Sequence, residues 1–172
     1  MNADPEVMTY MSRSLDRSAS DLFLARIQEH WDADGFGLWA IEPRYYGALL
    51  GFAGLSVPSF DGPFMPAVEV GWRLARNAWG YGYATEAGAA ALEHGFEVLG
   101  LAEIVSFTAV GNERSRRVME RLAMRHDPAD DFDYPLVPPG HLVHRQVLYR
   151  LSRETWQGRL DHTNHDPAVE GA

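Results

Sequence analysis

The segment from Trp79 to Glu86, with the sequence WGYGYATE, has the residue types and spacing of a ligand-binding turn. Its two glycines, Gly80 and Gly82, follow a predicted strand and precede a predicted helix. The first backbone N–H groups of a helix have no partner within the helix, and the helix dipole adds positive potential there. Glycines also let a ligand approach the backbone closely. The turn therefore predicts a phosphate or diphosphate site, with a turn that serves packing alone as an equal alternative.

Two common nucleotide-binding motifs do not fit this turn. A Rossmann turn would carry a third glycine at Thr85 and would follow the first strand of its domain, whereas at least three strands are predicted before it. A phosphate-loop NTPase would need a lysine, and all 15 basic residues of the chain are arginine. A dinucleotide-dependent oxidoreductase is therefore disfavoured.

Composition narrows the chemistry further. The chain has no cysteine, which excludes disulfides, a thiolate nucleophile and zinc sites built on sulfur. His141 and His144 have His-x-x-His spacing but no evident third ligand, so we predict no metal. The net charge of −9 argues against a nucleic-acid-binding face. No secretory signal is visible, and no run approaches the ~18 apolar residues of a membrane span, so we expect a cytoplasmic protein without a membrane partner.

Hydrophobic periodicity predicts the elements that hold the turn in place. Strands are expected at residues 38–41, 48–57, 67–75, 103–110 and 144–151, and helices at 20–31, 84–99 and 112–124. Ser20 and Asn112 are the expected N-caps of the first and last helices. This order predicts an α+β (α/β) sheet domain over residues 1–156, in which the strands at 67–75 and 103–110 are parallel neighbours. A long loop at 126–140 and a mobile tail at 157–172 complete the prediction.

Two segments resemble the acetyl-CoA-binding region of the GNAT superfamily, specifically its bacterial Rim-type branch, whose founding members acetylate protein N-termini. The first is VEVGWRL at 68–74 with WGYGYATEA at 79–87, and the second is IVSFT at 104–108 with NERS at 112–115 and VMERL at 118–122. Residues 39–41, 51–55 and 148–150 fit other strands of that fold, so the likeness covers about residues 5–152. It implies a GNAT fold with a mixed sheet of about six strands and helices on both faces. The family's first strand has no counterpart here, so either the chain starts late or another segment supplies the sheet edge.

The resemblance also implies where acetyl-CoA, the expected co-substrate, would lie. Its diphosphate would lie on the turn formed by Gly80, Tyr81, Gly82, Tyr83, Ala84 and Thr85. Its pantetheine arm would pair with the backbone of Trp72, Arg73 and Leu74, with Asn112 and Ser115 near the sulfur end. Trp79 stands where the family often has a glutamine or arginine, so a phosphate contact is expected to be missing there. For Tyr81 and Tyr83, a core or cofactor-stacking role is preferred to proton donation.

Glu69 and Ser115 are the residues expected to do the chemistry. Glu69 lies on the strand that bears the family's base, where it would take the ammonium proton directly or through water; pairing with Arg73 is the structural alternative. Backbone N–H groups of the same strand would polarise the carbonyl. Ser115 would hydrogen-bond the departing sulfur. Met119 aligns with the tyrosine general acid of many GNAT enzymes and cannot donate a proton.

Four arginines at the start of the last predicted helix admit two interpretations. They could reach the 3′-phosphate of the cofactor, or pair with Glu113 and Glu120 at the surface, which we favour for most of them: Arg114, Arg116, Arg117 and Arg121.

The sequence thus predicts an N-acetyltransferase that acts by direct attack, since no cysteine is present to carry an acyl group. The acceptor would be a primary amine, either a small molecule or a protein N-terminus. A GNAT-fold module that binds acyl-CoA without turnover is the alternative, favoured by Met119 and the missing first strand. A homodimer is compatible with this prediction, which specifies neither the acceptor nor the oligomeric state.

Overall fold

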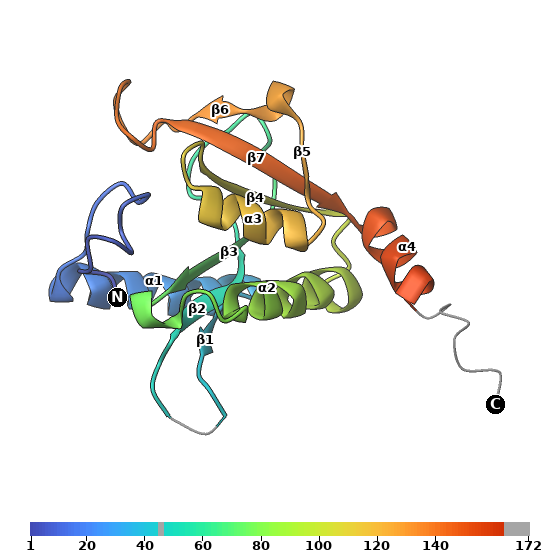
Figure 1. Ribbon diagram of the computed structural model, residues 1–172, viewed down its shortest axis with the longest axis horizontal. Helices are drawn as coiled ribbons and strands as arrows, with labels where there is room; N and C mark the ends of the chain where they lie inside the picture. The colour runs from blue at the N-terminus through green and yellow to red at the C-terminus, as the bar shows by residue number, and fades with distance from the viewer. Residues whose placement is uncertain (45–46, 164–172) are drawn as a thin grey trace.

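The computed structural model describes residues 1–44 and 47–163, which form a mixed sheet with helices on both faces (Figure 1). The sheet has seven strands in the order β1-β2-β3-β4-β7-β5, and β6 pairs with β7 beside this path. The bounds are β1 (Leu38–Ile41), β2 (Gly51–Ser56), β3 (Glu69–Leu74), β4 (Glu103–Ala109), β5 (Arg125–His126), β6 (Phe132–Asp133) and β7 (Arg145–Ser152). The predicted α+β architecture with a mixed sheet is confirmed, with seven strands in place of about six.

Four α-helices surround this sheet. They are α1 (Arg17–Asp34), α2 (Tyr83–Glu93), α3 (Glu113–Arg121) and α4 (Arg153–Thr163). The residues 94–98, predicted to continue the second helix, form a π-helical turn, η2 (His94–Val98), and two short 3-10 segments are η1 (Arg76–Ala78) and η3 (Pro128–Asp130). The prediction of Ser20 as the first N-cap is wrong: α1 begins earlier because the carboxylate of Asp16 accepts the N–H of Ala19 at 2.8 Å.

The helices divide between the two faces of the sheet. Phe23 of α1 packs on Phe52 of β2, with ring centroids 5.5 Å apart. On the opposite face, Leu92 of α2 and Met119 of α3 lie in the main core with Val70 of β3. α2 and α3 therefore lie on one face of the sheet, and α1 covers the other.

The sheet opens between its two central strands. β2 and β3 are antiparallel over their whole length, and so are β4 and β7. β3 and β4 are parallel neighbours, as predicted, but their register is confined to the pair Glu69 and Val105. Beyond that pair the strands diverge, which leaves the later backbone groups of β3 without a neighbouring strand on that side.

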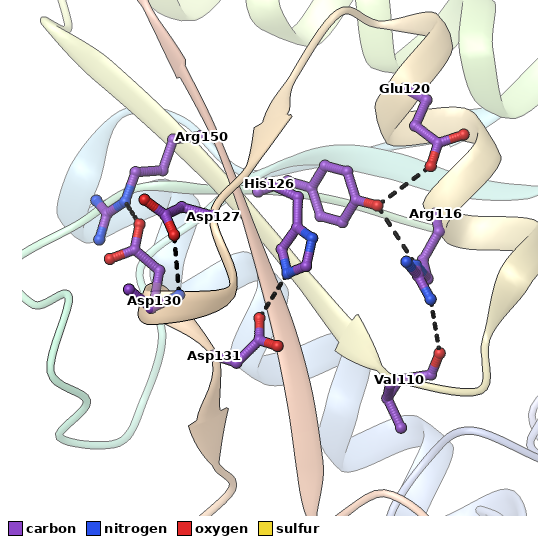
Figure 2. A network of polar contacts seen from close by, with 10 residues as sticks. Val110, Arg116, Glu120, His126, Asp127, Asp130, Asp131 and Arg150 are labelled. Atoms are coloured by element: carbon purple, nitrogen blue, oxygen red, sulfur yellow. Dashed lines mark hydrogen bonds and ion pairs between the residues drawn. The ribbon is translucent and has the colours of Figure 1, made fainter.

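The middle and the end of α3 are held by contacts with the far half of the sheet (Figure 2). Tyr149 of β7 donates its hydroxyl hydrogen to Glu120 at 3.3 Å and accepts from Nε of Arg116 at 3.4 Å. The ring of His126 stacks on Tyr149 with centroids 5.1 Å apart, and Nε2 of the same histidine lies 2.7 Å from a carboxylate oxygen of Asp131. These contacts hold α3 and the short β5 strand against β7.

Two other predictions are corrected. The expected loop at 126–140 contains β6 and η3, and β5 begins just before it. The expected tail from residue 157 is helical as far as Thr163, and residues 164–172 lie outside the described part of the chain. In the described residues no strand precedes β1, and the segment 1–16 forms turns over the groove described below. None of the helices in the described part has the length and hydrophobicity that a membrane span needs.

Candidate active site

A long groove of about 990 Å³ follows the opening between β3 and β4. Its walls are the end of β3, the turn before α2, the start of α3 and the N-terminal segment. It is lined by all but one of the residues predicted to contact a cofactor: Trp72, Arg73, Leu74, Trp79, Gly80, Gly82, Tyr83, Ala84, Thr85, Asn112 and Ser115. The exception is Tyr81, which is 73% exposed and does not line the groove. Tyr81 therefore belongs neither to the core nor to the groove wall.

The glycine turn leaves its backbone accessible to a ligand. Gly80 and Gly82 both have φ of 86°, a conformation that strongly favours glycine. A Cβ atom at either position would have nothing within 4 Å, so no side chain fills the turn. Gly82 is the N-cap of α2 and makes no side-chain cap, which leaves the first N–H groups of the helix free for an anion.

Trp79 brings positive charge to the groove through its neighbours. Its indole N–H donates to the carbonyl of Leu74 at 3.0 Å, which fixes the ring. The guanidinium groups of Arg76 and Arg114 lie over that ring, 4.8 and 4.4 Å from its centroid. A side-chain contact to phosphate, expected to be missing at Trp79, is therefore available from Arg114, whereas Arg76 is already paired with Glu6.

The arginines of α3 follow no single pattern. Arg117 pairs with Glu113 at 2.8 Å, as predicted for an exposed helix face. Arg114 instead lies over Trp79, and Arg116 reaches Tyr149 rather than Glu120. Arg114, Arg117 and Arg121 all line the long groove, so surface pairing and ligand contact are both open to this helix start.

A second space, the inner cavity of about 240 Å³, adjoins the long groove. Residues opposite one another in antiparallel strands share a face, so β2 and β3 present Phe52, Ser56, Glu69, Gly71 and Arg73 to it together. The other walls come from α1, β1, β4 and α3, including Phe23, Leu38, Ser106, Phe107, Thr108 and Met119. Met11, Trp72, Arg73 and Ser115 line both spaces, which therefore meet at these residues.

Glu69 lies where β3 and β4 begin to diverge. A Cβ atom at Gly71 would be 3.6 Å from Oε1 of Glu69, so the carboxyl group leans along the strand over the glycine. Burial in these mainly apolar surroundings raises the pKa of Glu69 from 4.5 to about 8. Within residues 1–44 and 47–163 no ion pair joins it to Arg73, so the structural alternative weighed from the sequence is wrong.

Ser115 is oriented by Asn112, the residue that caps α3 as predicted. Nδ2 of Asn112 donates to Oγ of Thr108 at 2.9 Å and to Oγ of Ser115 at 3.2 Å. Because the Ser115 oxygen already accepts a hydrogen bond, its own hydroxyl hydrogen is available to a group in the cavity. Met119 lies one helical turn further along, 1% exposed and part of the core, where it contributes apolar surface.

The N-terminal segment supplies residues that the sequence did not point to. Thr9, Tyr10 and Met11 line the long groove, and Glu6 forms an ion pair with Arg76 beside it. The residues after Pro5 show no helical or strand periodicity, so no local sequence pattern could have placed them in the groove. The described residues contain no group of three side chains that could hold a metal ion, and Nδ1 of His141 accepts the N–H of Val143.

Comparison with known proteins adds an independent result. Residues 1–125 match the family model for the acetyltransferase (GNAT) domain. FsC-acetyl coenzyme A-N(2)-transacetylase of Aspergillus fumigatus is 30% identical over 167 residues, which span 91% of this chain and 68% of that one. The crystal structure of an acetyltransferase from Agrobacterium tumefaciens has a TM-score of 0.67 and 28% identity, covering 87% and 79% of the two chains. Spermidine N-acetyltransferase from Vibrio cholerae, solved with CoA and spermine, shares the fold with a TM-score of 0.69 over 91% and 88%, at 16% identity.

Proposed function

The chain belongs to the GNAT acetyltransferase family, and on that premise we propose that it transfers the acetyl group of acetyl-CoA to a primary amine by direct attack. The observation that carries the proposal is the meeting of two spaces at Ser115 and Trp72, beside a carboxyl group of raised pKa on β3. A transferase needs a donor site and an acceptor site that share one wall, and this opening in the sheet provides both.

The residues of the long groove fit acetyl-CoA. The free N–H groups at the start of α2 can bind a diphosphate without lysine, and Arg114 adds positive charge beside Trp79. The unpaired edge of β3 offers backbone hydrogen bonds to an amide-containing arm. When bound there, the co-substrate supplies a thioester at the end of the groove nearest Ser115.

The protein's own groups then serve three steps of the transfer. Glu69, when ionised, takes a proton from the acceptor ammonium and leaves a nucleophilic neutral amine. Backbone N–H groups of β3 that face the opening stabilise the oxyanion as the nitrogen–carbon bond forms. As the carbon–sulfur bond breaks, the nitrogen gives up its second proton, and the departing thiolate, hydrogen-bonded by the hydroxyl of Ser115, takes up a proton to become the thiol. The products are the N-acetylated amine, which is an amide, and the free thiol of CoA.

A module that holds acyl-CoA without turnover is the second candidate. It is favoured by Met119, a buried methionine at the position where many relatives of this fold have a proton donor. Ser115 argues against that candidate, because its hydroxyl lies on the wall between the two spaces and retains a free hydrogen.

Thiol release from acetyl-CoA, measured with a panel of amines, amino acids and short peptides, distinguishes the two. The account predicts release that depends on the amine and yields a product 42 Da heavier than the acceptor, as acetylation adds C₂H₂O. Tight binding of CoA by calorimetry, with no release above the rate without protein for any acceptor, would assign the chain to the module. A Ser115→Ala variant should keep CoA affinity and lose rate.

A further inference from the structure

The inner cavity has two ionisable side chains of opposite charge on one face of β3. Glu69 and Arg73 lie four residues apart, and Gly71 between them carries no side chain. Four residues of strand correspond to ~13 Å between Cα atoms. The carboxyl group of Glu69 leans over Gly71 and shortens the gap between the two charges.

Arg73 has no carboxylate partner within the described residues. Nη1 donates to Oδ1 of Asn2 at 3.1 Å, and Nη2 contacts Sδ of Met11, also at 3.1 Å. The guanidinium carbon lies 5.4 and 5.2 Å from the ring centroids of Phe23 and Phe52. Its Nε is buried and has no hydrogen-bond partner.

This arrangement leaves a positive charge that the protein solvates only weakly. Burial lowers the pKa of Arg73 to about 10, which still keeps the guanidinium charged at neutral pH. A buried charge is costly unless it is paired, and a neutral amide, a thioether and two aromatic faces replace the carboxylate that usually pairs with an arginine. An anion in the cavity would complete the site.

We propose that Arg73 binds a carboxylate of the acceptor, so that the acceptor is a small amine that also carries a carboxylate and an apolar body. This inference rests on the proposed function, because Glu69 must receive the amine while Arg73 holds the acid group. Phe23, Phe52 and Phe107 supply apolar walls for a large aliphatic or aromatic side chain. A polyamine would place a second cation near Arg73, and the cavity of about 240 Å³ is smaller than the ~300–1,000 Å³ of drug-sized pockets.

Matched acceptors test this proposal on the wild-type protein. L-phenylalanine is compared with L-phenylalaninamide and phenethylamine, L-leucine with L-leucinamide and isoamylamine, and spermidine is added as a dication. Acetyl transfer should favour each amino acid over both of its partners by at least about tenfold in kcat/KM. In each amino-acid amide the carboxylate that raises the pKa of the α-amine is missing, so the α-amine is more often neutral. Reactivity of the amine alone would therefore favour the amide over the amino acid, which is the opposite of the predicted order.

Variants at Arg73 then locate the preference. Arg73→Gln should remove the preference for the amino acid, and Arg73→Lys should retain part of it because the charge remains. Arg125→Gln, at an exposed arginine of β5, should leave the ratio unchanged. Melting curves with and without CoA show whether each variant is folded, and the wild-type ratios stand even if one is not.

Each outcome has a separate meaning. If no amine is acetylated, the proposed function fails. If amines are acetylated but the amides or decarboxylated partners react as well as the amino acids, only the present inference is overturned. It is also overturned if Arg73→Gln weakens binding of CoA while the acceptor ratios keep their wild-type values, because the guanidinium would then serve the donor.

Discussion

At the scale of single residues, burial raises the pKa of the Glu69 carboxyl group into the range that suits a general base for amine acetylation. With a pKa of about 8 it is largely protonated at neutral pH, and its ionised fraction rises tenfold for each pH unit up to that value. Its carboxylate therefore binds the abstracted proton far more strongly than the carboxylate of an ordinary glutamic acid would. The cost is that only a minority of molecules carry the ionised base at pH 7.

The pH dependence of the reaction follows from this pKa. With an acceptor whose amine pKa lies well above 8, kcat/KM for the wild type should rise through pH 6–7 with unit slope and level off near pH 8. The Glu69→Gln variant should be slower by about 100-fold at pH 8, within the usual range for loss of a general base. Its rate should keep rising above pH 8, because it then follows the neutral amine alone.

CoA affinity is the control for that experiment. Glu69 lies in the inner cavity and does not line the long groove, so Glu69→Gln should bind CoA as the wild type does. A variant that retains the wild-type rate and the wild-type plateau would remove Glu69 from the mechanism.

Sequence and structure contribute differently at this scale. Glu69, Asn112 and Ser115 could be selected from the sequence because they lie in motifs that resemble a family. The perturbed pKa could not be predicted, since it depends on which side chains surround the carboxyl group and on the absence of a contact with Arg73. The role of Trp79 in holding Arg76 and Arg114 was equally hidden, because those three residues meet only when η1, the turn and α3 are folded together.

At the scale of elements, β3 lies between the proposed donor site and the proposed acceptor site. Its unpaired edge faces the long groove, while Glu69, Gly71 and Arg73 face the inner cavity. Gly71 faces the inner cavity without a side chain. Its φ is not positive, so other residues can adopt the same backbone conformation. A substitution there should therefore narrow the acceptor site without straining the backbone.

Gly71→Val tests this division. The added side chain would contact Oε1 of Glu69 and occupy part of the inner cavity. KM for the acceptor should therefore rise by about tenfold or more, which corresponds to a loss of ~1.4 kcal/mol in binding free energy. Ala40→Val, at an exposed position of β1, adds a comparable side chain outside the cavity and serves as control. Steady-state kinetics and CoA calorimetry give the result, and equal effects on donor and acceptor would contradict the division.

Elements with a strong local pattern could be predicted, and those fixed by tertiary pairing could not. β3 and α2 have clear periodicity, and the Asn112 cap was correctly placed. β5 and β6 have two residues each and exist because they pair with β7, so no periodicity reveals them. The start of α4 did carry a signal, since Oγ of Ser152 accepts the N–H of Thr155 at 3.2 Å in the manner of an N-cap.

At the scale of the whole molecule, the fold works by leaving one sheet incompletely paired. Parallel strands that separate after a single registered pair would expose backbone groups at a cost, unless a ligand or water satisfies them. The parallel pairing of β3 and β4 follows from general connection rules and was predicted. The separation itself was not, since it depends on how α2, α3 and the N-terminal segment pack around the opening. A homodimer stays a prediction.

Amide hydrogen exchange with and without CoA tests the central claim most directly. The account predicts that CoA slows exchange at Trp72 and Leu74, whose N–H groups face the opening beside β3, and at residues 80–84, which form the turn proposed to bind the diphosphate, and leaves β5 unchanged. Protection that appears elsewhere on the molecule, while the turn and the end of β3 exchange as fast as before, would show that this opening in the sheet is not the donor site.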